Sequence, residues 1–209
     1  MANPYDNRYR DPEYWGEKPT TIAAQFVTYL PMLKEAFPDT KLRVVDVGCG
    51  DGRDALYLAQ RDIEVTGVDS SSIGLARLRE KAEQAGLQTL VSCIHDDLIH
   101  YRPDSDYHAI LSSGALHYAP PETRSRLFEQ YKAHVLTGGL FACTVIVQKP
   151  FIPPAPDAEQ GVELFRSGEI SMYLWDWEIL WFAEEVKDCR SSGVLHKHAF
   201  NRIIARKLL

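Results

Sequence analysis

Three alternating glycines, placed directly after a short apolar segment, constrain the fold of this chain more than any other feature. Gly48, Gly50 and Gly52 follow the apolar run 42–47 and precede the helical pattern of 53–61. Residues without a side chain permit a tight strand-to-helix turn and let a ligand approach the backbone closely. The arrangement predicts an α/β fold with a ligand at the end of the first strand.

The rest of the chain alternates between apolar runs of strand length and amphipathic segments of helix length. The predicted strands cover residues 42–47, 63–68, 90–94, 109–113, 140–147, 177–185 and 196–206. The predicted helices cover residues 19–36, 53–61, 71–85 and 121–134, the first of them bent or broken at Pro31. Strands that alternate with helices form a parallel sheet with right-handed crossovers, to which the last two strands would add a hairpin.

Turn and capping residues mark the ends of several elements. Ser70 can cap the third helix, with Ser71 as the alternative, and we expect Gly86 to end it. Gly138 and Gly139 predict a turn before the fifth strand.

The length of 209 residues suits a single domain with a substantial core. Within it we expect an N-terminal arm and helix in 1–40, a cofactor-binding core in 41–147, and a substrate-side segment with the final hairpin in 148–209. Aromatic residues of the irregular arm either cover the site or simply anchor the arm; they are Tyr5, Tyr9, Tyr14 and Trp15.

The composition excludes several classes of partner. The net charge of -6 and the pI of about 5.6 argue against a nucleic acid, which needs a basic surface. No apolar run approaches the roughly 20 residues that span a membrane, and residues 1–15 do not resemble a signal peptide. We therefore expect a cytoplasmic monomer or homodimer that acts on a small molecule.

The cysteines are too scattered to predict a disulfide framework or a metal site. They form no C-x-x-C pair and stand at Cys49, Cys93, Cys143 and Cys189. The run from His95 to His100 contains possible ligands, but no third region supplies an obvious set of partners. The prediction is reduced thiols and no metal.

Carboxylates surround the glycine turn and decide between cofactors. A nicotinamide fingerprint would place its third glycine at Arg53, and a pyrophosphate would avoid a helix start crowded by Asp46 and Asp51. Asp69 ends the second strand, where a carboxylate can accept hydrogen bonds from a ribose, and Asp97 follows the third. The acids favour a cationic ligand such as S-adenosylmethionine, which carries a sulfonium and an ammonium.

Taken together, 46–53, Asp69 and Asp97-Leu98 resemble the first three motifs of class I methyltransferases. Residues 52–59, 110–113, 177–180, 185–186 and 205–207 are similar to the tellurite-resistance (TehB-like) methyltransferases, over about 14–207. The resemblance implies a doubly wound, Rossmann-like fold whose seven-stranded, mostly parallel sheet has an antiparallel last strand.

The resemblance also implies the cofactor-binding residues. The methionine portion of S-adenosylmethionine would lie on the turn, the ribose at Asp69, the adenine at Asp97 and Leu98, and the sulfonium above Ser112 and Ser113. The full predicted set is Asp46, Gly48, Cys49, Gly50, Arg53, Asp69, Ser70, Asp97, Leu98, Ser112 and Ser113.

The acceptor side departs from the family. TehB-like chains place His-Arg after their Glu-Val element and an arginine on the last strand. Here Cys189-Arg190 and Ala199 stand at those places, so a clamp of two arginines around an oxyanion is incomplete. The predicted catalytic or acceptor-contacting residues are His117, Arg190 and His198, and a general base is needed only for an acceptor that is protonated at neutral pH.

The sequence predicts methyl transfer from S-adenosylmethionine to a small-molecule nucleophile. A chalcogen oxyanion is one possible acceptor. One alternative is O- or N-methylation of a small metabolite. Another is a non-catalytic protein that binds S-adenosylmethionine. A nicotinamide dehydrogenase is disfavoured by the glycine spacing.

Overall fold

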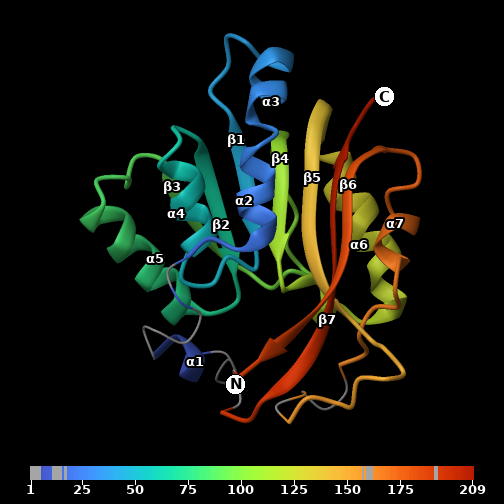
Figure 1. Cartoon of the computed structure of the whole chain (residues 1–209). Helices are drawn as coiled ribbons and strands as arrows, with labels where there is room; N and C mark the ends of the chain where they lie inside the picture. Colours follow the sequence, from blue (N-terminus) through green and yellow to red (C-terminus); the bar gives the residue numbers. More distant parts are fainter. Residues whose placement is uncertain (1–5, 11–15, 17, 157, 159–161, 191–192) are drawn as a thin grey trace.

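Seven strands form one sheet in the order β3-β2-β1-β4-β5-β7-β6 (Figure 1). The computed structural model describes residues 6–10, 16, 18–156, 158, 162–190 and 193–209. The strands are β1 (Arg43–Val47), β2 (Glu64–Asp69), β3 (Val91–His95), β4 (Tyr107–Ser113), β5 (Val135–Val147), β6 (Glu178–Cys189) and β7 (His196–Arg206).

Helices connect the strands and flank both faces of the sheet (Figure 1). They are α1 (Asp6–Arg10), α2 (Thr21–Val27), α3 (Leu30–Ala36), α4 (Arg53–Ala59), α5 (Ser72–Gln84), α6 (Pro121–Ala133) and α7 (Glu169–Met172), with a 3-10 turn η1 (Leu116–Tyr118). Pro31 divides the first predicted helix into α2 and α3, and it lies in the first turn of α3, where its missing N–H costs nothing. No helix of the described chain is long and apolar enough to cross a membrane.

The strand directions confirm the predicted fold class. β1 pairs in parallel with β2 and β4, β2 with β3, and β4 with β5. β7 is antiparallel to both β5 and β6, so β6 runs in the same direction as the rest of the sheet. The last strand along the chain is therefore inserted between two strands made before it.

Side chains that alternate along the strands divide the core between the two faces. Val45 and Ile110 point to the face covered by α6, where they pack with Phe128. Val44 and Leu111, one residue away in each strand, pack on the other face with the apolar side of α2, α4 and α5. Burial on both faces explains why these strands are continuously apolar.

Two local expectations were wrong, and a third is decided between its two alternatives. The arm contains the helix α1, although five residues are too few to show a helical period. Of the two serines that could cap α5, Ser71 does so, because its side chain accepts a hydrogen bond from the N–H of Gly74 at 3.1 Å. β5 begins at Val135 and runs through Gly138 and Gly139 instead of turning there, with a register shift opposite, between Tyr107 and Ala109.

The strand order fixes the place of the site. From β1 the chain proceeds to β2 and β3 on one side and to β4 and β5 on the other. Ligands of open α/β sheets bind at the carboxyl ends of the strands next to such a reversal. The glycine turn follows β1 at this edge.

Candidate functional site

The glycine turn adopts a backbone conformation that other residues rarely reach. Gly48, Gly50 and Gly52 have φ angles of 74°, 59° and 88°. A Cβ added to Gly48 would lie 2.2 Å from the Cβ of Ala115, and one on Gly52 would lie 2.1 Å from the Cδ1 of Leu78. The glycines are therefore required by the packing of the protein itself, in addition to any need of a ligand.

Asp69, at the end of β2, holds this turn in place. Its two carboxylate oxygens accept hydrogen bonds from the backbone N–H groups of Gly50 and Ser71, each at 2.8 Å. Burial raises the pKa of Asp69, and the two N–H donors oppose that rise. The outer lone pairs of the same oxygens remain geometrically suited to a second donor such as a hydroxyl.

Asp46, on β1, is a buried carboxylate with unused capacity. It is 2% exposed, and its Oδ2 has no hydrogen-bond partner among the described residues. Burial, followed by the nearby carboxylates of Asp54 and Asp69, raises the pKa of Asp46 well above its usual value. A bound cation would relieve this unfavourable arrangement of acids.

Asp97 follows β3 and is partly engaged by its own loop. Its Oδ1 accepts a hydrogen bond from the N–H of Ile99 at 2.8 Å, while Asp96 turns back to the N–H of Asp97. Asp97 and the neighbouring Leu98 both face the cavity described next, and Asp96 is not among its lining residues.

A cavity of about 1530 Å³ opens at the carboxyl edge of the sheet and gathers most of the predicted site. The predicted residues that line it are Asp46, Gly48, Cys49, Gly50, Arg53, Asp69, Ser70, Asp97, Leu98, Ser113, His117 and His198. The structure does not bring two others to it. Ser112 is buried and donates its hydroxyl to the carbonyl of Val47 at 2.8 Å, and Arg190 lies exposed at the hairpin end.

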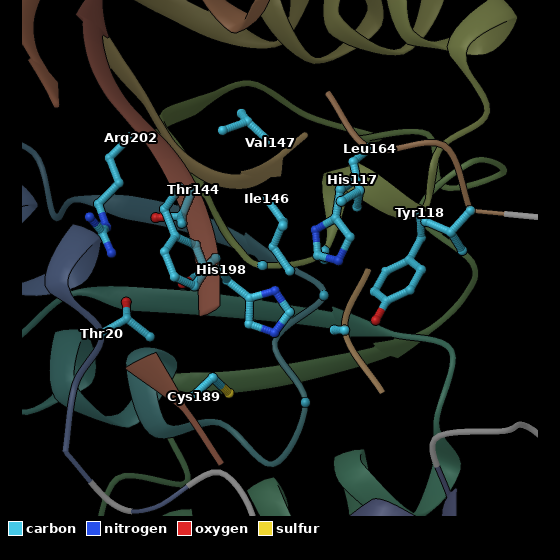
Figure 2. A pocket seen from close by; sticks show the side chains of 18 of the residues that line it. Thr20, His117, Tyr118, Thr144, Ile146, Val147, Leu164, Cys189, His198 and Arg202 are labelled. Carbon is cyan, nitrogen blue, oxygen red and sulfur yellow. The ribbon is translucent and has the colours of Figure 1, made fainter. Parts of the chain in front are cut away.

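The part of the cavity beyond the glycine turn, here called the acceptor end, is lined by His117, Tyr118, Ile146, Leu164 and His198. Figure 2 shows the rings of His117, Tyr118 and His198 around one space, next to Ile146. The rings of His117 and Tyr118 lie 4.3 Å apart between centroids. The acceptor end is thus an aromatic and aliphatic compartment containing two imidazoles.

His117 is neutral at physiological pH. It is 3% exposed, and its Nδ1 has no hydrogen-bond partner among the described residues. Burial, with smaller effects from the nearby His198 and Arg124, lowers the pKa of His117 to about 3. A group with so low a pKa is a weak proton acceptor, but a good site for receiving or donating one hydrogen bond.

The sequence interpretation missed contacts made by the N-terminal region. The hydroxyl of Tyr9, on α1, would lie 2.6 Å from a Cβ added to Gly50, and burial raises the pKa of Tyr9. Thr20 donates to both carboxylate oxygens of Asp54, from its N–H at 2.7 Å and its hydroxyl at 2.6 Å. The aromatic content of the arm was the available signal, and of those aromatic residues Tyr5, Tyr14 and Trp15 lie outside the described residues.

The fold also brings together three possible metal ligands where the sequence predicted none. Atoms of Cys189, His196 and His198 all lie within 4.8 Å of one another. Cys189 and His196 are directly paired between β6 and β7. The spacing of His196 and His198 places both on one face of β7, but only the register of the hairpin adds Cys189 to them.

Comparison with known proteins shows what the region around the glycine turn is similar to. Residues 44–139 match the family described as "Methyltransferase domain". The "Probable S-adenosyl-L-methionine-dependent methyltransferase TehB" of Haemophilus influenzae is 27% identical over 169 residues. That match covers 79% of this chain but only 57% of the relative, so the chain spans less than two thirds of the length of that protein.

Two further proteins extend the comparison. The "2-heptyl-1-hydroxyquinolin-4(1H)-one methyltransferase" of Mycobacteroides abscessus is 25% identical over 168 residues, covering 78% of this chain and 74% of the relative. The crystal structure of TehB from Haemophilus influenzae superposes with a TM-score of 0.71 at 24% identity, covering 85% of this chain and 61% of the other. Residues 44–139 therefore match a methyltransferase domain, the chain is similar in sequence to the S-adenosylmethionine-dependent methyltransferase TehB, and it shares the fold of that protein.

Proposed function

We propose that this chain transfers the methyl group of S-adenosylmethionine to a small organic nucleophile. The observation that carries the proposal is the buried Oδ2 of Asp46, which has no hydrogen-bond partner in the described part of the chain and lies beside the glycine turn at the wall of a large cavity. An uncompensated buried carboxylate is unfavourable unless a cation or a donor joins it. The ammonium of S-adenosylmethionine supplies both.

The described residues suit the other parts of the same cofactor. Asp69 would accept from the ribose hydroxyls with its outer lone pairs, and Asp97 with Leu98 would hold the adenine. Ser113 lines the cavity where the sulfonium is expected. The cofactor supplies a methyl group already activated on sulfur, so the protein mainly has to orient the acceptor and exclude water.

The acceptor end favours an organic molecule over a chalcogen oxyanion. Ile146, Val147 and Leu164 give it an apolar wall, and the whole cavity of about 1530 Å³, which also has to hold the cofactor, exceeds the range of about 300–1000 Å³ typical of a pocket for one ligand. Arg190 lies outside the lining, and Ala199 replaces the arginine expected on β7.

Three of the cations that line the cavity already have carboxylate partners. Arg202 and Lys187 both contact Glu185, at 2.8 Å and 3.1 Å. Lys197 pairs with Asp188 at 2.7 Å. An oxyanion would have to compete with these carboxylates, whereas a neutral acceptor would not.

We assign His117 a positioning role. A neutral imidazole with a pKa of about 3 does not hold a proton taken from the acceptor at neutral pH. Its Nδ1 can instead form a hydrogen bond that directs a hydroxyl or amine toward the methyl group. His198, on β7, is the second candidate for contact with the acceptor.

The test is a methyl-transfer assay with S-adenosylhomocysteine as the product measured. The acceptor panel contains flat aromatic hydroxyl compounds, amines and thiols, together with tellurite and selenite. Turnover of an organic acceptor supports the proposal. Turnover of the oxyanions alone would replace the organic acceptor with a chalcogen one, and calorimetric binding of the cofactor with no product from any acceptor would favour a non-catalytic binder.

A matched pair of variants links turnover to the cavity. Asp46→Asn removes the proposed ammonium partner and keeps the size of the side chain. Glu83→Gln makes the same chemical change at an exposed position of α5. We expect weaker cofactor binding only in the first variant, and equal affinity in both would contradict the assignment of Asp46.

A further inference from the structure

The cluster at the end of the β6–β7 hairpin consists of Cys189, His196 and His198, of which only His198 has been given a part in the proposed methyl transfer, as a candidate acceptor contact. His196 and His198 alternate along β7, so their side chains emerge on the same face. Cys189 is the cross-strand partner of His196 on that face. Two strands therefore present one thiol and two imidazoles to a single small space.

The distances suit a transition-metal ion. The Nε2 atoms of His196 and His198 are 2.9 Å apart, and the possible ligand atoms of all three residues lie within 4.8 Å of one another. A tetrahedral zinc ion, with Zn–N distances of about 2.0–2.1 Å, places two nitrogen ligands about 3.3 Å apart. The two imidazole nitrogens would have to separate by a few tenths of an ångström, and any pair of ligand atoms near the 4.8 Å limit would have to approach by about 1 Å.

The hydrogen bonding of His196 orients it as a ligand. Its Nδ1 lies 2.8 Å from the carbonyl oxygen of Val194, and only a protonated nitrogen forms that bond. In the neutral ring the Nε2 lone pair is then directed at His198. Metal-binding histidines characteristically donate their second nitrogen to a backbone carbonyl or carboxylate in this way.

The ligand types select the class of metal. Thiolate and imidazole together favour zinc and its neighbours over calcium or magnesium, which prefer oxygen. Three protein ligands, all half-buried, leave a fourth position free, as in zinc sites that bind water or substrate. Cys189 and His198 also line the cofactor cavity, so the free position adjoins the acceptor end (Figure 2).

We propose that Cys189, His196 and His198 bind one zinc-class divalent cation at the acceptor end of the cavity. Metal binding stands independently of the methyl transfer. A consequence that does rest on the proposed function is that the open position would hold the thiol or hydroxyl of the acceptor and lower its pKa. That would supply the activation that neutral His117 does not.

The first experiment measures metal content and needs neither cofactor nor acceptor. Protein equilibrated with zinc and dialysed against metal-free buffer is analysed by mass spectrometry of the metal. We expect about one zinc per chain in the wild type, and affinity at least about 100-fold weaker in Cys189→Ser and in His198→Asn. Cys93→Ser and His100→Asn, which change the same residue types outside the cluster, should retain the metal.

Cobalt provides a spectroscopic signature of the thiolate ligand. The wild type loaded with cobalt alone should show near-ultraviolet thiolate-to-cobalt charge transfer, which Cys189→Ser abolishes and Cys93→Ser preserves. Circular dichroism verifies that each variant is folded, and His196→Asn serves as a further ligand variant. The proposal would be overturned if the wild type did not bind zinc, or if Cys189→Ser and His198→Asn bound zinc as strongly as the wild type. Calorimetric binding of S-adenosylmethionine tests the proposed function separately.

Discussion

Gly48→Ala is the sharpest test of how the turn after β1 is held. The residue has a φ of 74°, and a methyl group there would meet the Cβ of Ala115 at 2.2 Å and its Cα at 3.7 Å. The left-handed backbone costs an ordinary residue about 1–2 kcal/mol. Forcing a methyl into a filled space costs about 1–3 kcal/mol more, for a total of about 2–5 kcal/mol.

Gly86→Ala provides the matched control. Gly86 has a φ of 69°, yet an added Cβ would meet nothing within 4 Å. Both substitutions restrict the unfolded chain equally, so the difference between them isolates the clash, about 1–3 kcal/mol. The double variant Gly48→Ala/Ala115→Gly removes the opposing methyl and should recover part of that difference.

Urea unfolding followed by circular dichroism measures these free energies of unfolding. We expect Gly48→Ala to unfold at clearly lower urea than Gly86→Ala, with the double variant showing a favourable coupling between the two sites. If Gly48→Ala and Gly86→Ala are equally destabilised, close packing does not explain the first glycine of the turn.

Four further expectations follow from buried polar groups. Burial raises the pKa of Asp46, so the contribution of this residue to stability is complete below the unfolded pKa of about 3.9 and is lost as pH rises through the folded pKa. Asp46→Asn should therefore unfold at a higher urea concentration than the wild type at about pH 8 but not at about pH 4. Asp69→Ala should weaken cofactor binding by about 1–3 kcal/mol in calorimetry, since it loses acceptors for buried hydroxyls, and unchanged affinity would reject that role. His117→Ala should raise the KM for the acceptor without changing the pH dependence of activity between about pH 5 and 9, because the pKa of His117 is about 3. If the acidic limb of the pH–activity profile shifts in this variant, His117 acts as a general base after all. Arg124→Met should cost about 3–5 kcal/mol in urea unfolding, because it removes the buried guanidinium that contacts Glu169 at 3.0 Å, and a loss below about 1 kcal/mol would show that this ion pair is dispensable.

The parts of the fold that depend on neighbouring residues could be predicted from the sequence. The apolar run before Gly48 and the helix after Gly52 define β1, the turn and α4 without reference to the rest of the molecule. The carboxylate at the end of β2 reaches the cavity because parallel strands end at a common edge. Local pattern and sheet topology agree here, so the prediction and the structure coincide.

The parts that depend on register or on distant packing could not. Ser112 and Ser113 are adjacent in sequence, but successive side chains of a strand point to opposite faces, and only Ser113 lines the cavity. Arg190 falls at the exposed end of the hairpin, whereas Cys189, one residue earlier, reaches the cavity. A shift of one residue decides such placements, and no local pattern encodes it.

The insertion of β7 between β5 and β6 has a consequence for assembly. Until residues 196–206 are synthesised, β6 has no neighbour to which it can hydrogen-bond, and the outer edge of β5 is open. That edge belongs to a strand with the buried apolar residues Phe141, Cys143 and Val145, which makes it a site for pairing with other chains. A nascent polypeptide interrupted before His196 would therefore retain the glycine turn yet be prone to aggregate, and completion of the sheet is a single late event in which one strand secures two others.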